Sequence, residues 1–275
     1  DFEHRNKKQR SRCSVRGEAM TITVAPSVNF RQPPKGQQVS LSEIEFPGTV
    51  AMNHVLQNSN QAMVSRESLF VRDLWVNYTT GEFKSPHPGW GESVRLTRTL
   101  KGASVPAGVP VPAADELIYV RVDFRQEMSG NFLHKVARFS DQVRAVVGPV
   151  RTWEGRLDPL RPENLGPRAF LLNCNELTVM QVPNVQPATI ELQAQGSVRV
   201  DGQLFAATGE RLVYDQTKDV ILLDGQGRVP AKLRYRSAPN APASEVTTGS
   251  IRYSPKTGQL LSTGIQGAQV IGSGQ

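Results

Sequence analysis

The fold is decided by the stretch Ile190–Val200, which reads IELQAQGSVRV. Small or apolar residues stand at its even positions from Leu192 to Val200, and polar residues stand at the odd positions between them. A period of two is that of a β-strand, because successive side chains point to opposite faces of the sheet. The stretch therefore predicts a strand with one buried face. It argues against a parallel-sheet strand, which would be apolar on both faces.

The same alternation recurs along the chain. It is seen in Ile118–Arg125 and Phe70–Tyr78, whereas helical spacing is found only in residues 131–147, which also suit a strand. Proline clusters at 32–36, 105–112 and 156–167 predict loops, because proline lacks the N–H of a sheet ladder. Turn signals separate the strands at intervals of about 8–12 residues in the C-terminal half. The signals in the whole chain are Thr80-Gly81, Asp201-Gly202, Lys218-Asp219, Asp224–Gly227, Thr248-Gly249 and Lys256–Gly258. These patterns predict an all-β fold of antiparallel strands joined in hairpins.

An internal repeat underlies these hairpins. Residues 210–222 align with residues 249–261 at a spacing of 39, and Leu69–Phe83 carries the same order of apolar residue, tyrosine, polar turn and apolar strand. Such repeats indicate stacked units that share a core, although ordinary hairpins could give the similarity by chance. The predicted organisation is a basic flexible terminus (1–12), a β-rich unit with the weak repeat (13–104), a proline-rich linker (105–114) and a second β unit (115–275).

The composition of the chain limits the classes of molecule that it is expected to bind. The chain has 275 residues and a net charge of +7, and residues 4–12 hold five cations without a carboxylate. A basic chain often binds an anionic partner, but a like-charged terminus is often only solvated. An aromatic content of 7% and the lack of an RNP-like run argue against nucleic acid. No window approaches the roughly 18 apolar residues of a membrane-spanning helix. The chain opens on Asp1 without an apolar signal segment, so we expect a mature form or a piece of a longer protein.

Residues that could carry catalysis are scattered. No His-Glu-x-x-His, Gly-x-Ser-x-Gly or glycine-rich phosphate loop is present, and Cys13 and Cys174 belong to no Cys-x-x-Cys pair. Cys174 lies in an apolar segment and is expected to be a small buried side chain rather than a nucleophile. The four histidines are isolated from one another: His4, His54, His87 and His134. We therefore expect no enzyme activity, no catalytic residue, no metal and no cofactor.

The repeat resembles a known family. Ala194, Gly196, Val198 and Val200 match an A-x-G-x-V-x-V pattern, and Leu204–Gly225 continues it through Tyr214-Asp215, a polar turn and an apolar strand. This sequence is similar to the OstA-like repeat of the LptA and LptC family and of the amino-terminal domain of LptD, periplasmic proteins of lipopolysaccharide transport. The resemblance covers about residues 190–270, with a weaker echo at 65–90. Residues 91–170 match poorly, and the proline-rich inserts are long for the family.

The resemblance implies an open β-jellyroll of repeated antiparallel strands, built as one unit or two stacked units, in the periplasm or cell envelope. Its apolar groove would hold the acyl chains of a lipid or a lipopolysaccharide-like glycolipid. Exposed edge strands would pair with other jellyrolls, including a second copy in a homo-oligomer. An alternative is a structural or protein-interaction scaffold of the envelope built from the same repeats. The groove candidates are Val198, Val200, Phe205, Leu212, Tyr214, Ile221 and Leu223.

Overall fold

The computed structural model describes residues 2–6, 9–25, 40–97, 116–161, 164–166, 169–182, 190–203, 205–215, 220–225, 229–236, 242–253 and 260–271. These residues form strands joined by turns and loops, and no α-helix occurs among them. The predicted all-β fold is therefore confirmed. The strands are β1 (Phe2–Asn6), β2 (Gln9–Gly17), β3 (Thr21–Ala25), β4 (Ser40–Asn58), β5 (Met63–Asn77), β6 (Glu82–Ser85), β7 (Gly89–Thr97), β8 (Glu116–Phe124), β9 (Glu127–Asn131), β10 (Val136–Val150), β11 (Phe170–Gln181), β12 (Ile190–Gly202), β13 (Phe205–Asp215), β14 (Val220–Asp224), β15 (Ala231–Tyr235), β16 (Ala243–Tyr253) and β17 (Leu260–Ile271).

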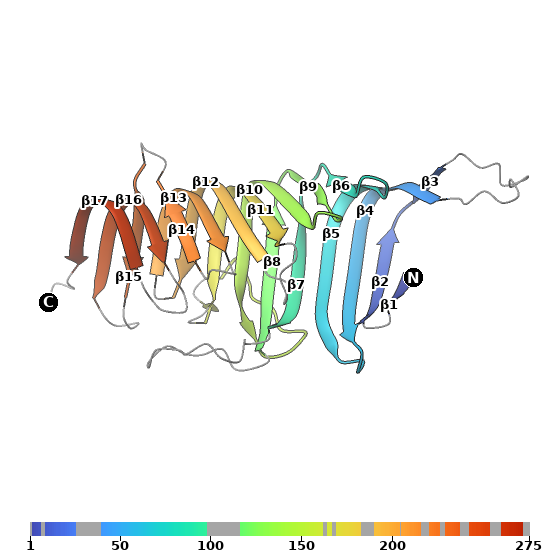
Figure 1. The fold of residues 1–275 in the computed structure, drawn as a ribbon, viewed down its shortest axis with the longest axis horizontal. Coiled ribbons are helices and arrows are strands. Elements are labelled where there is room, and N and C mark those ends of the chain that lie inside the picture. Colours follow the sequence, from blue (N-terminus) through green and yellow to red (C-terminus); the bar gives the residue numbers. More distant parts are fainter. Residues whose placement is uncertain are drawn as a thin grey trace, which may run out of the picture.

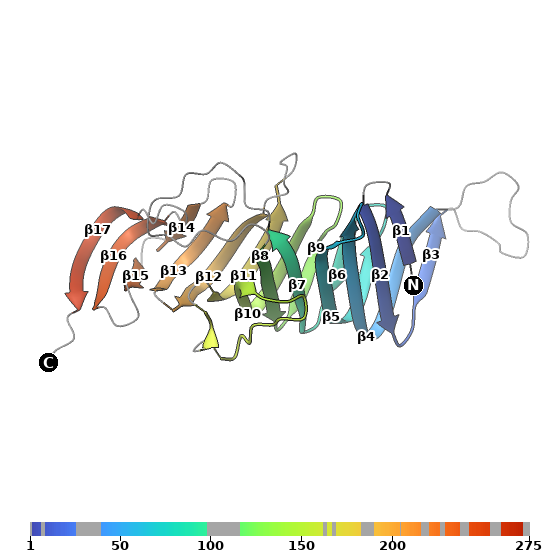
Figure 2. The ribbon, with the colours of Figure 1, turned by 90° about the horizontal axis from the view of Figure 1, so that it is seen from below.

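The strands belong to one 17-stranded sheet, and every pairing between them is antiparallel. Figure 1 shows them stacked along the long axis, from β1 to β3 at one end to β17 at the other. Figure 2 shows the same stacking from below. Neighbouring strands are mostly consecutive in the chain, as hairpin connections require.

The long strands β4, β5, β10, β11, β12, β13 and β16 run through both halves of this sheet. On one side of the sheet these long strands pair with β2, β7, β8 and β15, and we call this side half-sheet 1. On the other side the long strands pair with β3, β6, β9 and β14, and we call this side half-sheet 2. The three segments of the predicted repeat contribute to the β5–β6 and β13–β14 hairpins, which lie in half-sheet 2, and to the β16–β17 hairpin, which runs through both half-sheets.

A line of bends, which we call the corner, separates the half-sheets. The ladders shift register there in β4, β10, β11 and β12. Gly48, Asp73 and Gly196 have φ values of 78°, 54° and 75°. Positive φ suits glycine and, among other residues, aspartate and asparagine. Bulges of this kind bend a strand and add local twist.

The inward faces of the two half-sheets share one hydrophobic core, which we call the interior. Its buried residues run from Val50 in β4 to Ile251 in β16. Phe124 of half-sheet 1 lies 5.4 Å from Phe139 of half-sheet 2, measured between ring centroids. The predicted alternation is confirmed in β12, where Val198 is 1% exposed and Arg199 lies on the exposed face.

A second, smaller core lies on the outer face of half-sheet 1. Tyr119 and Val146 are buried there beneath Trp153, Leu157 and Leu165, which belong to the connection between β10 and β11. Described residues 151–161 of this connection contain no strand, as the proline cluster predicted for its second half. Half-sheet 1 is therefore covered on both faces where β7, β8, β10 and β11 pass.

The structure bears differently on three of the elements predicted from the sequence: one turn, the linker and the basic terminus. Thr248-Gly249 was predicted to be a turn between strands, but it lies inside β16, where the ladder shifts register at the corner. Residues 105–114, the predicted linker, lie outside the described residues. The strands on either side of them, β7 and β8, pair from Gly89 to Thr97. Residues 2–6 and 9–12 of the basic terminus lie in β1 and β2.

Candidate functional site

The groove residues predicted from sequence lie on adjacent strands and face the interior. Val198, Val200, Leu212 and Leu223 are buried, and Phe205, Tyr214 and Ile221 are partly buried against the same core. The ladder sets Leu212 beside Ala194 and Leu223, and it sets Tyr214 beside Leu192 and Ile221. Their alternation with outward polar residues is what brings them together.

Exposure rises with distance from the corner. In β12, Ala194 and Val198 next to the bend are buried, whereas Leu192 is partly exposed. In β11, Leu177 is buried and Val179 is only partly buried. The interior is thus filled by side chains of both half-sheets beside the corner, and its apolar residues reach solvent towards the rim.

The N-terminal end of the interior is also exposed. Val15 of β2 is paired with Met52 on the inward face, and it is 42% exposed. Ile22 of β3 is paired with Ile44 on the opposite half-sheet, and it is 51% exposed. These aliphatic side chains leave apolar surface uncovered where the stack ends.

A polar network interrupts the interior near this end. Glu67 of β5 lies in phase with Leu69 and Val71 on the inward face, and its carboxylate is 2.6 Å from Arg95 Nη2 and 3.3 Å from His54 Nδ1. Burial alone would raise the pKa of Glu67, but hydrogen bonds from His54 and Arg95 and the charge of Arg95 lower that pKa to about 2. The carboxylate is therefore ionised at neutral pH.

The cysteines sit in environments that favour the protonated thiol. Cys13 is the ladder partner of His54, and burial together with the Glu67 charge raises the pKa of its thiol. Burial and the Glu176 charge raise the pKa of Cys174 to about 12. A thiolate is the nucleophilic form, so these environments work against nucleophilic chemistry at either sulfur.

Sequence reasoning placed His54 among isolated histidines and did not find the network. The sequence did contain an indication of the network. His54 and Glu67 stand two residues from Met52 and Leu69, at positions where the strand alternation would otherwise place apolar residues. His87 also has a carboxylate partner, with its Nε2 2.9 Å from Asp73 at the corner. Periodicity gives the face on which a residue lies, but it does not give the strand that will pair beside it.

The described part of the chain contains no cluster of three or more histidine, cysteine, aspartate or glutamate side chains able to hold a metal ion. Nor does it contain a helix long and apolar enough to cross a membrane. No family model matches the chain, and no curated protein matches its sequence.

Proposed function

We propose that the chain is a non-catalytic module of the cell envelope or periplasm that carries or bridges a lipid, such as a lipopolysaccharide-like glycolipid. The carrying observation is the apolar interior, which continues from Val50 to Ile251 between the half-sheets and reaches solvent at its rim. Each methylene group of an acyl chain moved from water into such a surface gains about 0.8 kcal/mol. The net charge of +7 suits a phosphorylated head group.

Edge strands support the bridging part of the proposal. In the ladders of the described residues, β3 pairs only with β4, and β17 pairs only with β16. An edge strand presents unpaired backbone donors and acceptors that a strand of another chain can use. Another jellyroll, or a second copy of this chain, is therefore the partner we propose at the ends of the stack.

The filled part of the interior favours a different role. Val198 and Leu223 are 1% and 2% exposed, so side chains already occupy the space beside the corner. A structural or protein-interaction scaffold needs no more than this. A carrier would have to hold its lipid at the rim or separate the half-sheets.

Site-specific photocrosslinking distinguishes these roles. A benzophenone amino acid replaces Tyr214, which faces the interior, and a matched control replaces its neighbour Val213, which faces outward in the same strand. With lipopolysaccharide micelles, the carrier role predicts a lipid adduct at position 214 and little adduct at position 213. Equal adducts at both positions, or none at either in a folded protein, would contradict it and favour the scaffold.

A further inference from the structure

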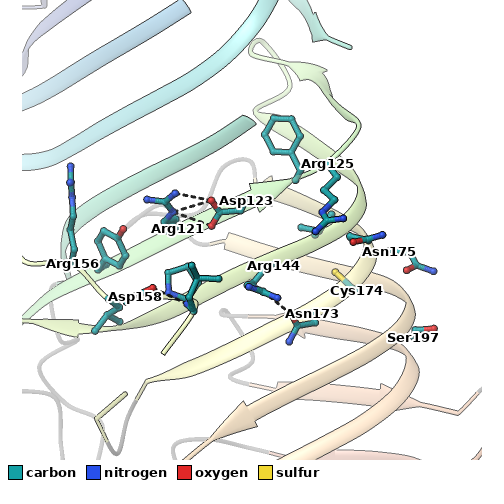
Figure 3. Close-up of a pocket in the computed structure, with 17 residues that line it drawn as sticks. Arg121, Asp123, Arg125, Arg144, Arg156, Asp158, Asn173, Cys174, Asn175 and Ser197 are labelled. Atoms are coloured by element: carbon teal, nitrogen blue, oxygen red, sulfur yellow. Dashed lines mark hydrogen bonds and ion pairs between the residues drawn. The ribbon is translucent and has the colours of Figure 1, made fainter. Parts of the chain in front are cut away.

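A pocket of about 670 Å³ opens on the outer face of half-sheet 1 and extends to the corner, where Phe124, Val143 and Cys174 of the interior core also line it. Its floor is formed by β8, β10 and β11, and its wall is residues 156–160 of the covering connection (Figure 3). Pockets of roughly 300–1,000 Å³ are typical of small-molecule sites. Its lining combines four arginines and several amide and hydroxyl side chains with apolar side chains such as Leu157 and Leu160.

The corner supplies three of the neutral polar side chains of the pocket. Gln142, Asn175 and Ser197 lie at three neighbouring bulges, in β10, β11 and β12, and all three are exposed. Gln142 and Ser197 have φ values of 46° and 51°. A bulge re-aims side chains, and here it brings donors from successive strands to one place on the surface.

The acidic groups of the pocket are already engaged. Both carboxylate oxygens of Asp123 accept hydrogen bonds from Arg121, at 2.8–3.2 Å. Asp158 accepts the Leu160 N–H at 2.8 Å and lies 3.6 Å from Arg161. Arg156 pairs with Glu92 at 2.8 Å, which also fixes the wall to β7.

Two arginines remain without a carboxylate. Among the described residues, neither Arg125 nor Arg144 forms an ion pair, and the hydrogen bond found for the Arg144 side chain runs from Nε to Asn173 Oδ1 at 3.3 Å. Figure 3 shows Arg125 and Arg144 near Asn173 and Asn175, with Arg121, Asp123 and Arg156 towards the other end. A guanidinium has five N–H donors, so both retain most of their hydrogen-bonding capacity.

We infer that this pocket binds a phosphate group borne on a sugar or similar polyol. Arginine forks match the oxygens of phosphate, and a pair of them free of carboxylates provides the charge that such a group needs. The amide and hydroxyl groups of Asn173, Asn175 and Ser197 suit the hydroxyls of the ring. The inference does not rest on the proposed lipid carriage, because none of the predicted groove residues lines this pocket. Both a soluble sugar phosphate and the head group of a membrane lipid present this chemistry.

The test is calorimetric titration of the folded chain with glucose 1-phosphate, with glucose, and with phosphatidylcholine vesicles containing phosphatidylinositol 4-phosphate. The pocket variants are Arg144→Gln and Arg125→Gln. The matched control is Arg138→Gln, an equal charge change at an exposed position of the same strand β10. Melting curves establish that each variant is folded, and if Arg144→Gln fails to fold, the exposed Arg125→Gln carries the test.

We expect saturable binding of a phosphate-bearing probe, no binding of glucose, and a loss of affinity of roughly tenfold or more in each pocket variant. The control should bind like the unmodified chain. Binding to the soluble sugar would identify a free ligand, and binding to vesicles alone would identify a head group. Lack of saturation with both phosphate probes, or an equal loss in Arg138→Gln, would overturn the inference. The calorimetric results do not affect the lipid adduct expected at position 214, so each of the two proposals can be refuted without the other.

Discussion

At the residue scale, the interior combines an apolar lining with the ionised network around Glu67. Glu67 is held by His54 and Arg95 on the inward face of half-sheet 1, where its neighbours along the strand are the buried Ser65 on one side and Leu69 on the other. A charge removed from water is tolerated when hydrogen bonds and an opposite charge replace its hydration. The network therefore marks a place near the N-terminal end where an acyl chain would meet a polar surface.

The Glu67 network predicts a dependence of stability on pH. The pKa of Glu67 is about 2 in the folded chain, against an ordinary value of 4.5, so the folded state binds this proton less readily than the unfolded state. Its stabilising contribution is complete above pH 4.5 and is lost as the pH falls towards 2. Urea unfolding at successive pH values should show this loss, and Glu67→Gln should flatten it. An unchanged slope in the variant would contradict the role of Glu67.

Val198 provides a test of the inward face. Val198→Asp would leave an unpaired charge in a position that is 1% exposed, and we expect a cost of about 3 kcal/mol or more in the free energy of unfolding. The adjacent Arg199 lies on the outer face in an exposed pair with Asp201. Arg199→Gln should therefore change stability by less than about 1 kcal/mol in the same denaturant titration. Similar costs for both variants would show that the face is wrongly assigned.

At the element scale, the bends matter as much as the strands. Glycine and aspartate patterns predicted turns at Thr80-Gly81 and Asp201-Gly202, and the structure has strand ends at both. The similar residue pair Thr248-Gly249 does not end a strand but lies inside β16, where the strand bends at the corner. A residue pattern gives the local backbone conformation, but whether the chain reverses or merely bends depends on the neighbouring strands. Sequence alone therefore predicted the strands well and the corner poorly.

Gly196 is the most direct test of the corner. It has a φ of +75°, and a Cβ added there would lie 2.7 Å from Asn175 Nδ2. Gly196→Val would combine a disfavoured backbone conformation with crowding of the neighbouring strand, so we expect a loss of about 1–3 kcal/mol in the free energy of unfolding. Gly166→Ala is the control, because no atom lies within 4 Å of its added Cβ. Thermal and denaturant unfolding would compare the two, and a neutral Gly196→Val would mean that the bend tolerates a side chain.

At the scale of the whole molecule, one sheet and one interior join segments that are distant in the sequence. Alternation and the internal repeat were sufficient to predict stacked antiparallel strands. They did not reveal the outer core under Trp153 and Leu157 or the pocket beside it, because those depend on where the connection after β10 packs. An irregular segment that packs on the outer face of a sheet contributes only a few apolar residues, and these residues follow no regular period. Hydrophobic periodicity therefore cannot predict that they are buried.

The continuity of the interior predicts cooperative unfolding across the proposed linker. Leu223 in β14 is 2% exposed and belongs to the same core as Val71 and Leu74 in β5. In a Trp153→Phe background, the remaining tryptophans are Trp75 and Trp90, which both precede residues 105–114.

Leu223→Ala should cost about 2–5 kcal/mol through the cavity it creates. If the stack unfolds as one unit, the fluorescence midpoint of Trp75 and Trp90 in denaturant should fall together with the far-ultraviolet circular dichroism midpoint. An unmoved fluorescence midpoint beside a lowered dichroism midpoint would instead separate 13–104 from 115–275, as stacked repeats with weak coupling between neighbours would do.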